Sequence, residues 1–144
     1  MLNEHVRDIM TKNPIVVRPN DTISFVSNLM VQKRLQQLPV VDNDGKLSGI
    51  ITSYDLWKNT MQPNGSVNKM VKDIMIKDVL KIAPKDKLGT AAELFMDKRF
   101  KTIPVVNLDN ELKGVVTAFD VIRYTMKKEY KTPILYKDVL GGSR

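Results

Sequence analysis

The chain has 144 residues, a formal net charge of +7, no cysteine and a single histidine, His5. This composition excludes disulfides, metal sites built on His and Cys, and catalysis by Ser-His-Asp or Cys-His groups, so we expect no metal site and no required cofactor. The positive charge favours an anionic partner.

The sequence also bears on size and location. At this length the chain suits one compact domain or two small halves that share a core. No apolar run approaches the ~18 residues of a membrane span, and the first residues carry acids where a signal peptide needs an apolar core. We therefore expect a cytoplasmic protein with no membrane span.

The first half of the sequence predicts strands and helices in the order β-α-β-β-α. Runs of β-branched residues indicate strands, apolar residues at helical spacing after a Pro-Asn-Asp-Thr turn indicate a helix, and an Asp-Asn-Asp-Gly turn indicates a hairpin. The expected elements are a short segment at 6–10, a strand at 15–17, a helix at 23–34, strands at 38–41 and 47–52, a helix at 53–61 and a turn-rich connection at 62–66.

The second half repeats this order without a gap at a constant offset of 65 residues, as from Pro39 to Pro104 and from Asp44 to Asp109. Such self-similarity indicates an internal duplication. The expected elements are a short segment at 71–75, a strand at 79–82, a helix at about 86–96, strands at 103–106 and 112–117, and a helix at 119–128.

The duplication predicts the domain organisation. We expect one unit at residues 1–65, a second at 66–130 and a flexible tail at 131–144. A unit of about 60 residues buries a poor fraction of its surface when alone. The two units should therefore pack their apolar sheet faces together, with the helices outside, and leave two equivalent clefts.

One motif in each half carries recognisable chemistry: Gly-Ile-Ile-Thr-Ser-Tyr-Asp at 49–55 and Gly-Val-Val-Thr-Ala-Phe-Asp at 114–120. Each predicts a strand that ends in Thr and enters a helix with an Asp in its first turn. The N–H groups of a helix N-terminus suit a phosphate, and an ionised Asp can accept hydrogen bonds from both hydroxyls of a ribose. Alternatively, Thr only caps the helix and Asp only complements its dipole. The second copy favours a nucleotide site.

The ordered set of motifs, present twice, resembles a tandem pair of cystathionine-β-synthase (CBS) domains, or Bateman module, over about residues 5–127. The resemblance rests on the β-α-β-β-α unit, the Leu-Pro-Val-Val strand at 38–41, the Asp-Asn-Asp-Gly turn and the Gly-x-x-Thr-x-x-Asp ending. It implies an α/β (α+β) fold of two β-α-β-β-α CBS motifs with pseudo-two-fold symmetry.

The resemblance implies a regulatory sensor and not an enzyme. Such modules bind AMP, ADP, ATP or S-adenosylmethionine in clefts between the two motifs and transmit a conformational change to a regulated protein, here unknown. They usually associate as dimers. We expect a homodimer through apolar faces of the last helix of each half, including Leu56, Trp57, Val121 and Ile122.

The resemblance also implies which residues bind the ligand. The ribose-binding Asp falls on Asp55 and Asp120, and the hydroxyl near the phosphate on Thr52 and Thr117. The other implied ligand-binding residues are Met10, Ile15, Gln36, Gln37, Ser53, Met75, Leu80, Lys101, Thr102 and Ala118.

The residues that precede the central Pro of each half suggest that the two clefts differ. The residues before the central Pro are neutral in the first half, at 36–37, and include the cation Lys101 in the second. An ammonium adds a charge-assisted contact to a phosphate, so the cleft with Lys101 is predicted to prefer more highly phosphorylated ligands.

Two alternatives remain open at this point. A basic nucleic-acid-binding protein would use the charge of +7, but the Lys and Arg are spread along the chain and no recognition motif is evident. A structural adaptor with unused clefts would have no need of two intact Thr-x-x-Asp copies. Competition between a mononucleotide and nucleic acid distinguishes the first alternative from a nucleotide sensor.

Overall fold

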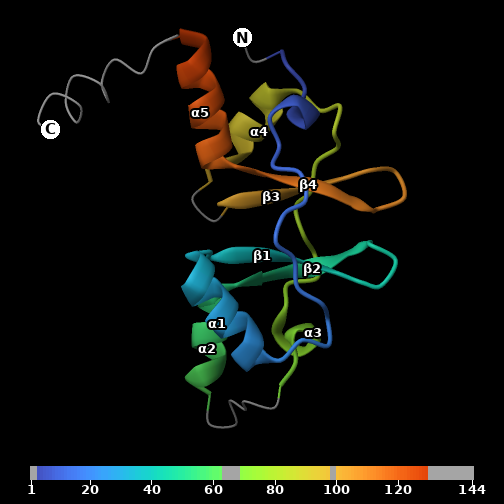
Figure 1. Cartoon of the computed structure of the whole chain (residues 1–144), viewed down its shortest axis with the longest axis vertical. Coiled ribbons are helices and arrows are strands. Elements are labelled where there is room, and N and C mark those ends of the chain that lie inside the picture. The colour runs from blue at the N-terminus through green and yellow to red at the C-terminus, as the bar shows by residue number, and fades with distance from the viewer. Residues whose placement is uncertain (1–2, 63–68, 98–99, 130–144) are drawn as a thin grey trace, which may run out of the picture.

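Two similar halves stack on each other through two small sheets, and the helices lie outside them (Figure 1). The computed structural model describes residues 3–62, 69–97 and 100–129; most of the predicted connection at 62–66 and the predicted tail lie outside them. The elements are η1 (Val6–Asp8), α1 (Ile23–Lys33), β1 (Gln37–Val41), β2 (Leu47–Thr52), α2 (Ser53–Thr60), α3 (Val71–Ile74), α4 (Leu88–Leu94), β3 (Thr102–Val106), β4 (Leu112–Thr117) and α5 (Ala118–Glu129).

The two hairpins confirm the predicted duplication down to the pairing register. β1 pairs antiparallel with β2, with Pro39 opposite Ile50, and β3 pairs with β4, with Pro104 opposite Val115. Gly45 closes the first hairpin with φ of 78°, which the Asp-Asn-Asp-Gly turn requires. The equal registers place equivalent residues of the two halves in equivalent positions.

The predicted strands at 15–17 and 79–82 are reduced to one residue each. Val17 makes a single parallel bridge to Val40, and Ile82 makes one to Val105. Prolines at 14, 19 and 84 bound these segments. A proline has no N–H to donate to a ladder, so the pairing cannot extend.

A short segment before each half, which begins with η1 in one case and with α3 in the other, crosses over and packs against the other half. We call it the crossing segment; it ends near Thr11 in the first case and near Ile76 in the second. Val6 of η1 is buried in the second core with Ile82, and Val71 of α3 is buried in the first core with Val17. Figure 1 shows α3 beside α1 and α2 for this reason. The 65-residue offset does not predict this exchange, which ties the halves together reciprocally.

The glycine of each Gly-x-x-Thr-x-x-Asp motif admits the crossing segment. Beside Gly49, Ile50 and Ile76 exchange backbone hydrogen bonds of 2.9 and 2.8 Å. A Cβ on Gly49 would lie 2.5 Å from the carbonyl oxygen of Ile76, and one on Gly114 would lie 2.7 Å from that of Thr11. The close approach that the glycines permit is therefore by the chain itself.

The N-terminal segment is held to α5 by a polar contact that responds to pH. Nζ of Lys128 lies 3.7 Å from Oε1 of Glu4, and the interaction of the Glu4 carboxylate with the Tyr124 hydroxyl raises the pKa of Tyr124 from 10.0 to about 12 and lowers the pKa of Glu4 from 4.5. The protonated tyrosine is the donor, so its contribution to stability is full below pH 10.0 and is lost as pH rises through about 12. The contribution of Glu4 is full above pH 4.5 and is lost as pH falls through its lowered pKa.

We predict that Glu4→Gln moves the titration of Tyr124 back toward its ordinary pKa of 10.0, because the amide carries no charge. Ultraviolet absorbance of the ionised phenol measures this titration. Tyr124→Phe identifies the step by removing it. A step that stays at about 12 in Glu4→Gln would contradict the contact.

Candidate ligand-binding site

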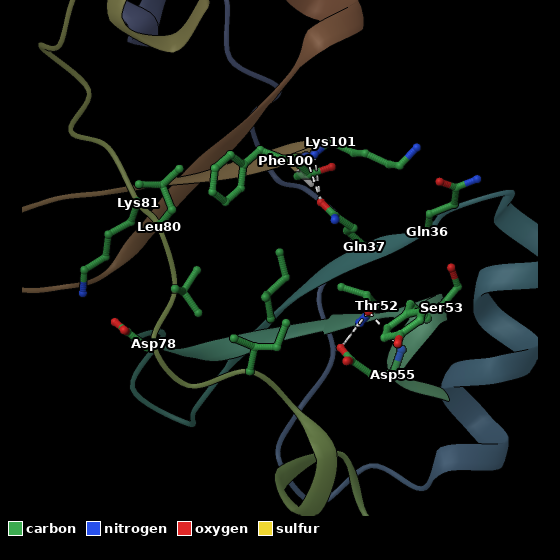
Figure 2. A pocket seen from close by; sticks show the side chains of 15 residues that line it. Gln36, Gln37, Thr52, Ser53, Asp55, Asp78, Leu80, Lys81, Phe100 and Lys101 are labelled. Atoms are coloured by element: carbon green, nitrogen blue, oxygen red, sulfur yellow. Dashed lines mark hydrogen bonds between the residues drawn. The ribbon is translucent and has the colours of Figure 1, made fainter. Parts of the chain in front are cut away.

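A cavity of about 940 Å³ opens between the two halves and is lined by both of them (Figure 2). One wall is formed by the ends of β1 and β2 and the first turn of α2. The opposite wall is formed by the chain that follows the crossing segment, at 78–81, and by residues 100–102. The predicted ligand-binding residues that line it are Gln36, Gln37, Thr52, Ser53, Asp55, Leu80, Lys101 and Thr102.

Thr52 and Asp55 form a capping box at the junction of β2 and α2. The Thr52 hydroxyl accepts from the Asp55 N–H at 3.1 Å and donates to Oδ2 of Asp55 at 2.7 Å, and the Thr52 N–H donates to the same Oδ2 at 3.2 Å. Thr52 therefore does cap the helix, as the structural alternative in the sequence analysis supposed. It leaves Oδ1 of Asp55 without a partner in the described part of the chain, so the residue can cap the helix and still accept from a ligand hydroxyl.

The residues before the two central prolines meet each other across the halves. Oε1 of Gln37 accepts from the backbone N–H groups of Lys101 at 3.2 Å and Thr102 at 3.0 Å. Gln36 and Lys101 line the same cavity and lie at the same end of it in Figure 2. The prediction that these positions give the two clefts different phosphate preferences is therefore wrong in its geometry, because both sets serve one cavity.

Several lining residues were not predicted. Phe100, which precedes Lys101, is partly buried against the second core and also lines the cavity. The lining residues that follow the crossing segment were not predicted from the sequence, because the packing of this segment against the other half was not predicted either. The predicted residues Met75 and Leu80 lie at either end of this stretch. The other residues missed are Ile50, Tyr54, Ile76, Asp78, Val79 and Lys81.

The remaining predicted residues lie outside this cavity. Met75 packs against the first core beside Gly49, and Met10 lies in the equivalent place beside Gly114. Met10 also lines a separate, shallower hollow of about 560 Å³, together with the cations Arg7, Lys12 and Lys113. Ile15 is partly exposed, and Thr117, Ala118 and Asp120 form the junction of β4 and α5.

Asp120 is far more enclosed than its counterpart Asp55. Its side chain is 5% exposed. Oδ2 accepts from the Thr117 N–H at 2.9 Å, and Oδ1 accepts from the guanidinium of Arg123 at 2.7 Å. The two motifs therefore share a backbone arrangement, but their carboxylates differ in burial and in hydrogen-bond partners.

Residues 3–62, 69–97 and 100–129 hold no cluster of three metal-binding side chains. None of their helices has the length and apolar character needed to cross a membrane.

Comparison with known proteins identifies the family. The family model of the CBS domain matches residues 6–56 and 71–127. The chain belongs to the CBS-domain family, as a tandem pair. The predicted family and the predicted fold of two CBS motifs are thereby confirmed.

Solved CBS pairs share this fold and include complexes with adenosine compounds. CBSX2 of Arabidopsis thaliana, crystallised in complex with AMP, is 30% identical, with a TM-score of 0.79 and coverage of 87% of this chain and 98% of that one. The CBS pair of protein MJ0100, in complex with 5′-methylthioadenosine and S-adenosyl-L-methionine, is 30% identical, with a TM-score of 0.74 and coverage of 87% and 98%.

Curated relatives include enzymes of which the CBS pair is only a part. Homoserine O-acetyltransferase of Methanococcus vannielii is 33% identical over 116 residues, which cover 81% of this chain and 24% of the enzyme. Inosine-5′-monophosphate dehydrogenase of Aquifex aeolicus is 32% identical over 136 residues, which cover 94% and 26%. This chain thus spans about a quarter of the length of these relatives.

Proposed function

We propose that this CBS pair is a regulatory module, without catalytic activity of its own, that binds AMP, ADP, ATP or S-adenosylmethionine in the cavity between its motifs. The observation that carries the proposal is that the Thr52–Asp55 capping box, Ile76 and the chain at 78–81 and 100–102 line one cavity of about 940 Å³. CBSX2 with AMP and the MJ0100 pair with adenosine ligands support the choice of ligand class.

The chemistry of the cavity suggests how such a ligand lies. Oδ1 of Asp55 is the acceptor for a ribose hydroxyl. Ile50, Ile76 and Leu80 offer apolar surface to the adenine ring. The phosphates, or the methionine end of S-adenosylmethionine, then extend toward Ser53 at the start of α2 and toward Lys101.

Regulation follows from the position of the cavity between the motifs. A ligand that contacts both halves binds one relative arrangement of them better than another and shifts the population toward it. We propose that a regulated protein, or a further domain, responds to that arrangement. A cytoplasmic location is part of this proposal, and cell fractionation tests it.

A thermal-shift screen with AMP, ADP, ATP, S-adenosylmethionine and NAD tests the ligand class. A ligand that binds only the folded chain stabilises it by about 2.7 kcal/mol at 100 times its Kd, so at least one adenosine ligand should raise Tm by several degrees. No shift with any of them, together with salt-sensitive stabilisation by an oligonucleotide that AMP does not reverse, would favour the nucleic-acid alternative instead.

We also propose that the module forms a homodimer through α2 and α5, which lie on the same flank of the molecule (Figure 1). The sequence prediction needs a correction, because Leu56 is 7% exposed in the first core and Val121 packs against the second. The exposed apolar stripe consists of equivalent residues of the two halves: Tyr54, Trp57 and the C-cap residue Met61 of α2, and Phe119, Ile122 and Met126 of α5. A pseudo-symmetric apolar stripe suits a two-fold interface.

Trp57→Glu combined with Ile122→Glu is expected to convert this dimer into a monomer, because both side chains are 59% exposed and two charges would be desolvated in the interface. Analytical ultracentrifugation at high micromolar concentration measures the change. Val31→Glu is the matched control, since Val31 is an exposed apolar residue on α1 that does not belong to the stripe. A wild-type chain that sediments as a monomer would rule the dimer out.

A further inference from the structure

The duplication provides an internal comparison between two carboxylates that the sequence makes equivalent. Asp55 lines the cavity, and its Oδ1 has no partner in the described residues. Asp120 is buried, and both of its oxygens are engaged within the chain. Two side-chain differences between the halves account for the contrast.

The first difference is Arg123, which takes the place of Lys58. The two residues lie one turn after the two aspartates, and only Arg123 forms an ion pair with its aspartate, at 2.7 Å. Its guanidinium also lies 5.3 Å from the centre of the Phe119 ring. A planar guanidinium can donate hydrogen bonds and at the same time stack on an aromatic ring, which an ammonium does less well.

The second difference is Thr11, which takes the place of Ile76 in the crossing segment. The Thr11 hydroxyl lies 3.4 Å from Oδ2 of Asp120 and donates toward it. Ile76 presents no donor to Asp55. The carboxylate of Asp120 is therefore approached by side chains from both neighbouring elements, α5 and the crossing segment, and that of Asp55 by neither.

We propose that Asp120 is a structural ion-pair residue and that Arg123 occupies the position in which a ligand diol would bind, so that the chain binds one diol-bearing ligand, at Asp55. This inference rests on the proposed function. A ribose at Asp120 would have to displace the guanidinium and so replace an ion pair between two charged groups with hydrogen bonds from neutral hydroxyls. Arg123 thus acts as an internal competitor for the second site, and Lys58 does not compete for the first.

Isothermal titration calorimetry with AMP tests this assignment through stoichiometry. The wild type should bind one AMP per chain. Asp120→Asn should keep that stoichiometry and affinity, whereas Asp55→Asn should lose affinity by at least about tenfold, the effect of 1.4 kcal/mol. Arg123→Gln should show a second binding event, and its matched control Lys58→Gln should not.

Two results would overturn the inference: two AMP per wild-type chain with one lost in Asp120→Asn, or a single AMP in Arg123→Gln. A wild type that binds none of the adenosine ligands would instead contradict the proposed function. The ion pair is then tested without ligand by a thermal double-mutant cycle on Asp120→Asn and Arg123→Gln. Additive effects on Tm would overturn the structural role of the pair, and non-additive effects would support it.

Discussion

Asp55→Ala should weaken AMP binding by about 10- to 150-fold and leave the chain folded. The substitution removes hydrogen bonds from ligand hydroxyls to a charged acceptor, which contribute about 1.5–3 kcal/mol. Thr52 still caps α2, because its hydroxyl accepts from the backbone N–H of residue 55 and not from the side chain. Calorimetry with AMP measures the affinity, and circular dichroism reports whether the fold is retained.

Asp73→Ala provides a matched control for the loss of a helix-capping carboxylate. Asp73 occupies in α3 the capping position that Asp55 occupies in α2, and its Oδ2 accepts from the Met70 N–H at 2.9 Å. It is exposed and does not line the cavity. Asp73→Ala should therefore lower stability without changing AMP affinity. Equal losses of AMP affinity in the two variants would mean that Asp55 acts only through its helix.

Gly49→Ala should lower the free energy of unfolding by about 1–3 kcal/mol, the usual effect of inserting a methyl group into a fully packed site. The added Cβ would meet the backbone carbonyl of Ile76 at 2.5 Å and the sulfur of Met75 at 3.0 Å, so the crossing segment must move. Since that segment leads into the wall of the cavity at 78–81, the same variant should also bind AMP more weakly. Denaturant unfolding and calorimetry measure the two effects.

Gly114→Ala separates the two effects of Gly49→Ala. A Cβ on Gly114 would lie 2.7 Å from the carbonyl oxygen of Thr11 and 2.9 Å from the Met10 sulfur, so the steric conflict is nearly the same. The segment that it would displace contacts Asp120 through Thr11 and does not line the cavity at Asp55. Gly114→Ala should therefore destabilise the chain to a similar extent but retain AMP binding at a temperature at which both variants are folded. A loss of binding in both variants would show that the effect is global.

Local patterns in the sequence predicted the parts of the fold that local physics decides. The hairpins follow from turn chemistry and runs of β-branched residues, and the start of α2 follows from Thr52 and Asp55. The bounds of β2 and β4 agree with the predicted strands at 47–52 and 112–117. The predicted helix faces were less successful: Leu56 and Trp57 are neighbours in sequence, and only packing against the sheet decides which of them is buried.

Contacts between distant parts of the chain could not be predicted in this way. The exchange of η1 and α3 depends on Val6 and Val71 fitting the opposite core, and short apolar segments carry no signal for their partner. The same exchange brings Ile76 and residues 78–81 to the cavity wall. The difference between Asp55 and Asp120 was also missed, although Lys58 and Arg123 differ in the sequence, because the ion pair depends on side-chain conformation.

The basic hollow formed by Arg7, Lys12 and Lys113 is where the alternative of a charge-driven partner would act. The carboxylate among its lining residues is Asp8, which is exposed. The two surfaces share no lining residue, so mapping where AMP binds distinguishes the hypotheses directly.

Amide chemical-shift mapping of the isotopically labelled chain during titration with AMP is the most direct test of the central proposal that the ligand lies between the two CBS motifs. We predict saturable shifts concentrated at 52–55, 76–81 and 100–102, with little change at Arg7, Lys12 and Lys113. Shifts that gather at those three cations and leave Thr52 and Asp55 unchanged, or that do not saturate, would contradict it.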